Sequence, residues 1–347
     1  MTEILKKTLL FFTIAFTMLS CEKTVSDFQI KKHPGKLVLN GILNTDSAIL
    51  INLSRNMSIE EKAINPPFVK NADIKLFEND KYVGAVEYLS DGYYTIDMNP
   101  GENKVYHISA EAEGFPPVSS STRMPKKEHI AKIKTNYLLN INDPNCIGCE
   151  PVNFLELEIK LENNSTLEKY YSLSVETNTM NTLCRKQICE LVTHPEYNYN
   201  YDSCYCVDMD TMEIFSREVQ YNCDEKVIDF LNAYGSYWVE SYPGMLHSEI
   251  YFKASRLALS DNRIIIKINR HDLHNNYENK IKIRLSSLSE EAYTFLYSMA
   301  RVNETDMDPF AEKVTIYTNI ENGLGLFAGH VHYDTIIEFD PGRLELY

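Results

Sequence analysis

One of the eight cysteines in this 347-residue chain stands in a sequence context that allows lipid modification. Cys21 follows the pair Lys6-Lys7, an apolar stretch from Leu9 to Leu19, and the small residue Ser20. The apolar stretch is about half of the roughly 20 residues that a transmembrane helix needs, which is typical of a cleaved export signal. We therefore expect residues 1–20 to be a lipoprotein signal peptide and the thiol of Cys21 to receive the lipid.

Lipidation of Cys21 would fix the mature chain to a membrane. Each buried methylene contributes about 0.8 kcal/mol, so a single acyl chain binds marginally and two or more hold the protein stably. Residues 21–35 are polar and lack any period, as expected for a lipidated tether. The alternative is an ordinary signal peptide that contains a cysteine by chance, because Met18 and Leu19 depart from the usual lipoprotein order.

The other seven cysteines lie between residues 146 and 223. They are Cys146, Cys149, Cys184, Cys189, Cys204, Cys206 and Cys223. Export favours disulfides over free thiols. The Cys-x-x-Cys spacing of Cys146 and Cys149 also resembles half of a zinc site or a redox motif, but no second such pair and no thioredoxin-like βαβ pattern accompanies it. We expect structural disulfides with one thiol left over, and the pairing does not follow from the sequence.

Two histidines have the spacing of metal ligands. His330 and His332 are two residues apart on a predicted strand, so both rings would lie on one face and could chelate a metal with a third ligand. No third ligand can be placed, and such pairs are more often exposed polar residues. The chain also lacks Gly-x-Ser-x-Gly, P-loop, dinucleotide and His-Glu-x-x-His motifs. We expect no metal, no cofactor and no catalytic residue, hence a protein that is not an enzyme.

Tyrosine gives the clearest sequence hint of binding. The chain has 23 tyrosines, and several cluster in a turn-rich segment bracketed by cysteines. The candidate ligand-binding residues are Tyr197, Tyr199, Tyr201, Tyr205 and, further along, Trp238. Tyrosine offers rigid contact area with a polar tip, which suits recognition of a peptide, glycan or protein. The alternative is that loops of exported β-proteins are simply rich in tyrosine and asparagine.

Composition sets the broad class. The chain is 44% hydrophobic and 24% charged, which is too apolar for a disordered protein, and its length suggests two domains. The formal net charge is −15. A nucleic-acid partner is therefore not expected, because neutralising phosphates needs a basic face.

The pattern after the tether predicts a β-sandwich over residues 36–125. Short runs rich in β-branched and aromatic residues alternate with turn signals such as Asn79-Asp80 and Asp91-Gly92. The predicted strands are 36–43, 48–55, 72–77, 81–88, 92–96 and 105–112. Six or seven strands at this spacing are typical of an immunoglobulin-like or carboxypeptidase-regulatory-like sandwich.

The remainder, residues 126–347, predicts a larger antiparallel β domain that contains the cysteines. Residues 154–162 and 280–286 alternate apolar with charged side chains, and further strands are expected at 170–176, 264–268 and 314–317. One helix should follow a capping box formed by Ser287 and Glu290. Its apolar stripe consists of Ala292, Phe295, Leu296 and Met299.

Three sequence segments resemble a known family. They are the string Asp308–Gly329, the early strand Leu37–Leu43 and the motif Gly114-Phe-Pro-Pro117. Together they resemble a Bacteroidetes outer-membrane lipoprotein family of unknown function, whose members are commonly encoded beside TonB-dependent receptors. The resemblance spans nearly the whole mature chain, with Lys313 where the family tends to have proline. It transfers no catalytic residues, because the family carries no established activity.

The resemblance implies an outer-membrane, lipid-anchored protein that acts as an accessory ligand-capture or docking component of a TonB-dependent transport system. A receptor of that kind and the membrane itself would be its partners, and the ligand is not implied. Two alternatives stay open: a structural or adhesive surface lipoprotein without a transport role, and a metal- or thiol-handling lipoprotein.

Overall fold

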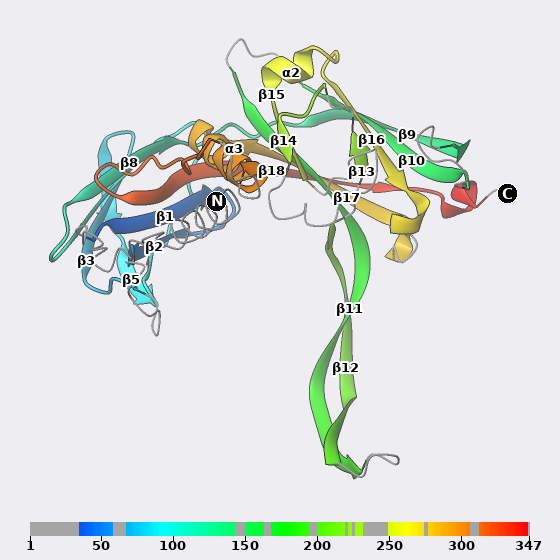
Figure 1. Cartoon of the computed structure of the whole chain (residues 1–347), viewed down its shortest axis with the longest axis horizontal. Coiled ribbons are helices and arrows are strands. Elements are labelled where there is room, and N and C mark those ends of the chain that lie inside the picture. Colours follow the sequence, from blue (N-terminus) through cyan, green and yellow to red (C-terminus); the bar gives the residue numbers. More distant parts are fainter. Residues whose placement is uncertain are drawn as a thin grey trace, which may run out of the picture. The chain divides into compact units, whose positions relative to one another are not determined.

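The computed structural model of the protein shows a mainly β fold, as the sequence predicts (Figure 1). The described residues are 35–57, 67–142, 150–162, 168–193, 200–218, 221–223, 226–231, 249–273, 277–305 and 312–345. The predicted signal peptide, Cys21 and nearly all of the predicted tether lie outside them.

Within the described residues the strands form three sheets. The central sheet has the order β14-β15-β11-β17-β18-β1-β2-β6-β5, with β12 paired to β11. Its strands are β1 (Leu37–Asn44), β2 (Ile49–Arg55), β5 (Glu87–Ser90), β6 (Tyr93–Ile96), β11 (Tyr170–Thr193), β12 (Asn200–Glu218), β14 (Phe230–Leu231), β15 (Glu249–Lys253), β17 (Lys280–Leu288) and β18 (Leu324–Glu338).

Two four-stranded sheets cover one face of the central sheet. The N-terminal covering sheet has the order β4-β3-β7-β8, and the C-terminal covering sheet has the order β13-β16-β10-β9. Their strands are β3 (Ala72–Glu78), β4 (Lys81–Ala85), β7 (Val105–Ala112), β8 (Val118–Arg123), β9 (Ile130–Ile141), β10 (Val152–Leu161), β13 (Tyr221–Cys223) and β16 (Arg263–Asn269).

The N-terminal covering sheet and the β1, β2 and β6 part of the central sheet enclose one hydrophobic core. Alternate residues of each strand enter it, for example Leu39 and Ile51 from one sheet and Leu76 and Ile108 from the other, all fully buried. Two sheets with interdigitated inner faces make a β-sandwich, so the predicted sandwich is confirmed. The strand pattern alone had not indicated that Phe327, from the far end of the chain, completes this core.

A second core lies between the C-terminal covering sheet and the β11, β15 and β17 part of the central sheet. The faultless alternation of β10 puts Leu155, Leu157 and Ile159 into it, opposite Ile281 and Ile283 of β17. The predicted division at residue 125 falls on the connection between β8 and β9 and stays a prediction. One sheet therefore serves as a layer in both sandwiches.

The helix α3 (Glu290–Thr305) packs on the opposite face of the central sheet. Leu326 and Ala328 of β18 point to this face and join Ala292 and Tyr293 in a third apolar cluster, with Phe295 and Leu296 partly buried beside it. The predicted helix is thus confirmed. Within the described residues the other helical elements are short: α2 (Ala254–Ala258) and the 3₁₀ turns Arg270–Leu273, Tyr277–Asn279 and Pro341–Leu344.

The strand that joins the two sandwiches is β18, which pairs in parallel with β1 and antiparallel with β17. Gly325 makes the parallel pairing possible. Its φ is +110°, and a Cβ there would lie 2.1 Å from the carbonyl oxygen of Leu39. A residue other than glycine would therefore suffer both backbone strain and a clash with the backbone of β1.

Three predicted elements differ from the structure. The run 81–88 is two strands, β4 and β5, which belong to different sheets and meet at the buried Val86. Residues 314–317 form no strand. The Asn319 side chain instead hydrogen-bonds both backbone groups of Phe327, at 2.9 Å to its N–H and 2.7 Å to its carbonyl oxygen. The short backbone pairing of this segment is an isolated bridge between Glu321 and Ser119.

The third difference is the start of the helix. Ser287 was expected to cap it, but that residue stays in β17 and pairs with Tyr171 and Val331. Ser289 is the capping residue, since its Oγ accepts a hydrogen bond from the Ala292 N–H at 3.2 Å. The helix therefore begins two residues later than the capping-box pattern indicated.

The strands β11 and β12 form a long two-stranded ribbon (Figure 1). Residues 170–177 of β11 also pair with β17, whereas its remaining residues pair with β12 alone among the described strands. The register sets Cys189 directly opposite Cys204. Cys184 and Cys206 are opposite Met209 and Gln187, so neither faces another cysteine in this register.

We predict that Gly325→Ala lowers the free energy of unfolding by about 2 kcal/mol or more, because it adds positive-φ strain and a backbone clash at the β1–β18 pairing. Gly114→Ala is the matched control: its φ is +83°, but nothing lies within 4 Å of the added Cβ, so only the strain applies. Urea unfolding of both variants measures the difference. Equal losses of unfolding free energy in the two variants would contradict the proposed clash between the added Cβ and the backbone of Leu39.

A second prediction concerns the ribbon: Cys189 and Cys204 form a disulfide. Directly opposed residues of antiparallel strands have Cα atoms about 4.5–5.5 Å apart, which lies in the range that a disulfide spans. Cleavage after glutamate without reduction should leave peptide 177–190 linked to peptide 197–213 in the mass spectrum, and fragmentation should assign the bond to Cys189 and Cys204 and not to Cys184 or Cys206. Reduction should separate them and cost about 3 kcal/mol of stability. Full alkylation of both thiols in the unreduced, unfolded protein would contradict the bridge.

Candidate functional site

A pocket of about 430 Å³ lies where the two sandwiches meet. Three segments line most of it: the connection after β8, the start of β11, and the end of β17 with the first turn of α3. The residues of these segments that line it are Arg123–Lys126, Glu128, Glu168–Tyr171 and Ser287–Glu291. The volume falls in the range of pockets that hold small organic ligands.

The connection after β8 is fixed by contacts of Met124. This residue is fully buried, and its N–H donates to the Lys104 carbonyl oxygen at 2.8 Å. Its thioether lies so close to β18 that a Cβ on Gly329 would be 2.4 Å from the Met124 sulfur. Because Gly329 has no side chain, Met124 can pack directly against β18, and this wall of the pocket lies close to the central sheet.

The first turn of α3 is fixed to both sandwiches. The Gly329 N–H donates to Ser289 Oγ at 3.2 Å, and Thr122 Oγ1 of β8 donates to Glu291 Oε2 at 2.8 Å. Thr122 and Ser289 are buried. The helix terminus is thus held by hydrogen bonds from β18 and β8, and the pocket wall that it forms is rigidly placed.

Ser287 is the distinctive residue of the pocket. The residue is 4% exposed, and its Oγ has no hydrogen-bond partner among the described residues. The odd-numbered residues of β17 before it, Ile281, Ile283 and Leu285, face the second core, so Ser287 is a polar residue at an apolar position. A buried hydroxyl without a partner costs about 1–3 kcal/mol, so a ligand or water molecule that hydrogen-bonds it would be stabilised here.

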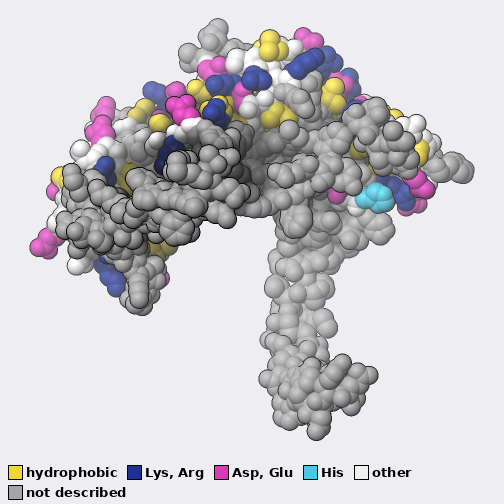
Figure 2. Space-filling view, viewed as in Figure 1, with side chains coloured by type: hydrophobic (Ala, Val, Ile, Leu, Met, Phe, Trp, Pro, Cys, Tyr) yellow, Lys and Arg dark blue, Asp and Glu magenta, His cyan; other side chains and the backbone are white. Residues whose placement is uncertain are grey.

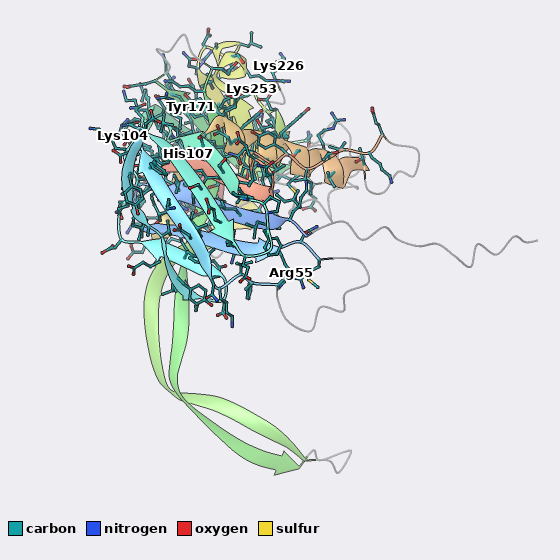
Figure 3. All side chains as sticks on the ribbon, turned by 90° about the vertical axis from the view of Figure 1, so that its left-hand side faces the viewer. Arg55, Lys104, His107, Tyr171, Lys226 and Lys253 are labelled. Atoms are coloured by element: carbon teal, nitrogen blue, oxygen red, sulfur yellow. The ribbon has the colours of Figure 1, made fainter. Side chains whose placement is uncertain are left out.

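Charged groups of both signs surround the opening. Lys169 binds Glu128 at 2.6 Å, and Glu168 Oε1 accepts from the Ser255 N–H at 3.0 Å. Burial raises the pKa of Tyr171, and the carboxylates of Glu128 and Glu168 add to the increase. Figure 3 marks Tyr171 at the start of β11, with Lys104 of the N-terminal sandwich and Lys253 of β15 also labelled.

A negative potential acts on Tyr170 in the same pocket. Burial raises its pKa first, and the carboxylates of Glu290, Glu168 and Glu291 raise it further. The ring of Tyr170 lies 4.7 Å from that of Tyr293, which packs it against α3. The phenol is therefore an aromatic surface close to several negative charges.

The histidine pair lies elsewhere, on the face of the central sheet that also carries α3. The rings of His330 and His332 are 4.3 Å apart, so the structure brings these two candidate metal ligands together. His332 Nδ1 is 2.8 Å from Ser286 Oγ. Among the described residues no group of three histidine, cysteine, aspartate or glutamate side chains could hold a metal ion.

Charged side chains of β17 and β18 lie next to the histidines on the same face of the sheet. Arg284 binds both carboxylate oxygens of Asp334 at 2.8 Å, and Lys282 pairs with Glu176. Burial lowers the pKa of His330 to about 4, with further lowering by His332 and Arg284 and an opposing effect of Asp46. The pKa of His332 is also lowered, first by burial and then by Arg284.

Several of the candidate residues from the sequence lie in segments that the structure does not describe. Tyr197, Tyr199, Trp238, Cys146 and Cys149 lie outside the described residues. The backbones of the others are described, on β11, β12 and β13, but not their side chains. These are Tyr201, Tyr205, Cys184, Cys189, Cys204, Cys206 and Cys223. Their roles in binding and disulfide formation stay predictions.

The pocket itself was missed by the sequence analysis. One signal could have indicated it: after Ile281, Ile283 and Leu285, the apolar alternation of β17 reaches Ser287, where a core residue is expected. The other lining segments are far apart in the sequence. Nothing in their composition shows that the residues near 125, 170 and 290 meet.

Surface charge is mixed on the side of the molecule seen in Figure 2. Lysine and arginine side chains of the described residues are interspersed with aspartate and glutamate there, and they do not gather into one basic patch. No helix in the described ranges is both long and apolar enough to cross a membrane.

Comparison with known proteins places the chain in a family. Residues 23–335 match the family model described as the domain of unknown function DUF4249. The chain belongs to the DUF4249 family. The family match includes β1, β18 and all three segments of the pocket, so these features lie in the DUF4249 region.

Other comparisons add little to this DUF4249 protein. No curated protein matches it. One solved structure with detectable similarity is a Corynebacterium diphtheriae protein described as membrane anchored, with 10% sequence identity and a TM-score of 0.19. The match covers 74% of this chain and 55% of that one, so the chain spans about half the length of this neighbour.

The partly buried histidines predict a loss of stability in acid. Folding lowers the pKa of His330 from 6.5 to about 4, so the unfolded state binds the proton more readily over this interval. The contribution is fully present above about pH 6.5 and is lost as the pH falls to about 4, by at most about 3 kcal/mol. Urea unfolding across this pH range measures it. His330→Gln should flatten the dependence, and an unchanged slope in that variant would assign the effect to other groups.

Proposed function

We propose that this protein is a lipoprotein of the outer membrane, anchored through Cys21, which captures a ligand and serves as an accessory component of a TonB-dependent transport system. It would act by binding and presenting the ligand, without catalysing a reaction. The membrane and a TonB-dependent receptor would be its partners.

Two observations support the location and the partner. The sequence places Cys21 directly after an apolar export signal, which suits lipid attachment. The family that the sequence resembles is commonly encoded beside TonB-dependent receptors, and membership of the DUF4249 family is consistent with that resemblance.

The pocket between the sandwiches is the observation that carries ligand capture. It is built from three separate segments, its wall is held by hydrogen bonds from β8 and β18, and Ser287 leaves a buried hydroxyl unsatisfied within it. A preformed cavity with a few placed polar groups is the usual form of a small-ligand site. The unpaired hydroxyl gives a bound ligand a hydrogen-bonding group inside the pocket.

The proposal predicts that a TonB-dependent receptor co-purifies with the full chain from mildly solubilised outer membranes. Cys21→Ala is the control, because removing the acceptor thiol should release the protein from the membrane fraction. Fractionation, incorporation of labelled lipid and mass spectrometry of the co-purified proteins measure the two effects.

Each part can fail separately. A Cys21→Ala variant that still sediments with membranes would disprove the anchor. An anchored protein that recovers no receptor would contradict the transport role and favour a structural or adhesive surface lipoprotein.

A further inference from the structure

The pocket contains a group of carboxylates that the protein does not neutralise. Glu168 comes from the start of β11, and Glu290 and Glu291 come from the first turn of α3. None of the three forms an ion pair within the described part of the chain, whereas Glu128 in the same pocket binds Lys169. Glu168 and Glu290 are exposed and Glu291 is partly buried, so water screens part of their mutual repulsion and a bound cation would reduce it further.

The side chains that could neutralise this group are engaged or exposed. Lys169 is committed to Glu128 at 2.6 Å. Arg123 donates to the Asn103 carbonyl oxygen at 3.3 Å and, like Lys126, is exposed at the rim. Lys253, opposite Tyr170 in the β11–β15 register, lies with its Nζ 5.5 Å from the Tyr293 ring and is not among the residues that line the pocket. Four glutamates and three basic residues line the pocket, so a net negative charge remains there.

Ser287 points to a ligand independently of the charges. Its Oγ is buried, lines the same pocket and has no partner. A hydroxyl can donate one hydrogen bond and accept others, so it can bind a hydroxyl, amide or carbonyl group of a ligand. The pocket thus offers a site for a cation and a separate site for a neutral polar group.

We propose that this pocket binds a small organic ligand through a primary ammonium group, which lies against Tyr170 among the carboxylates of Glu168, Glu290 and Glu291, while a neutral polar group of the same ligand hydrogen-bonds Ser287 Oγ. Carboxylates supply charge-assisted hydrogen bonds to the ammonium, and the tyrosine ring supplies a cation–π surface. The α-amine of a short peptide and the amine of an amino sugar both have this chemistry. The assignment rests on the ligand capture proposed above.

Matched probe pairs test the ammonium requirement on the full, detergent-solubilised lipoprotein. The pairs are triglycine with N-acetyl-triglycine and glucosamine with N-acetylglucosamine, which differ within each pair by the loss of the charge. Ligand-observed NMR should show the amine of one pair binding about tenfold or more tightly than its acetylated form. Tighter binding of triglycine than of its acetylated form would indicate a peptide ligand, and the same difference for glucosamine would indicate an amino sugar. Equal binding within both pairs, or no binding by any probe, overturns the proposal.

Variants of the lining residues locate the ammonium site. Glu168→Gln and Glu290→Gln should each weaken binding of the responding amine about tenfold, because a charge-assisted hydrogen bond becomes a neutral one. Glu111→Gln, an exposed carboxylate on β7 away from the pocket, is the matched control and should leave binding unchanged. Equal effects of all three variants would show only a general dependence on charge and would overturn the assignment.

Ser287→Ala separates a binding role from a structural one. Because the hydroxyl has no partner in the described part of the chain, its removal should leave the thermal midpoint of the ligand-free protein unchanged or higher. The same variant should weaken binding of the amine probe. A lower midpoint with unchanged binding would overturn the role of Ser287. Receptor co-purification does not depend on these probes, so failure of the ammonium assignment and failure of the transport role are distinguishable.

Discussion

The parallel pairing of β1 with β18 is the interaction on which the rest of the structure depends. It joins residues 38–44 to residues 324–330, nearly the whole length of the described chain apart. Through it, β18 supplies Phe327 and Val331 to the first core and, on its other edge, pairs with β17 of the second sandwich. A single continuous sheet results, because β18 pairs with β1 of the first sandwich on one edge and with β17 of the second sandwich on the other. Without this pairing the two cores would have no shared layer.

The pocket is a consequence of that arrangement. Two covering sheets lie on one face of a shared sheet, and their connection through Met124 passes over the place where β17 ends and α3 begins. Gly329 allows the close contact with Met124, while its N–H holds Ser289 at the helix terminus. The same strand that joins the sandwiches therefore also sets the walls of the cavity. Ser287 and the carboxylates around Tyr170 are energetic costs that the folded protein bears at this pocket. Such local costs are typical of functional sites.

Much of the secondary structure could be predicted because local patterns and tertiary packing agree. The alternation in β10 and β17 gives strands with one buried face, and the apolar stripe after Glu290 gives a helix with one packed face. The predicted strands were wrong where the residue pattern does not show which neighbouring strand the segment pairs with. Residues 81–88 have the composition of one strand but cross between two sheets at Val86. Residues 314–317 have strand-forming side chains, yet the Asn319 amide occupies the backbone groups of Phe327 that a neighbouring strand would use.

The sequence by itself determined the strand-rich class, the first sandwich, the position of the helix and the features that motivate an exported, lipid-anchored protein, since these depend on local periodicity and on a short contiguous signal. Only the tertiary structure decided that β18 completes the first sandwich and that a pocket forms at its junction with the second. The physical reason is that the pocket residues come from segments around positions 125, 170 and 290, whose proximity depends on long-range strand pairing. Ser287 shows the difference most clearly: in the sequence it resembles a helix cap, and only its pairing within β17 makes it a buried hydroxyl without a partner.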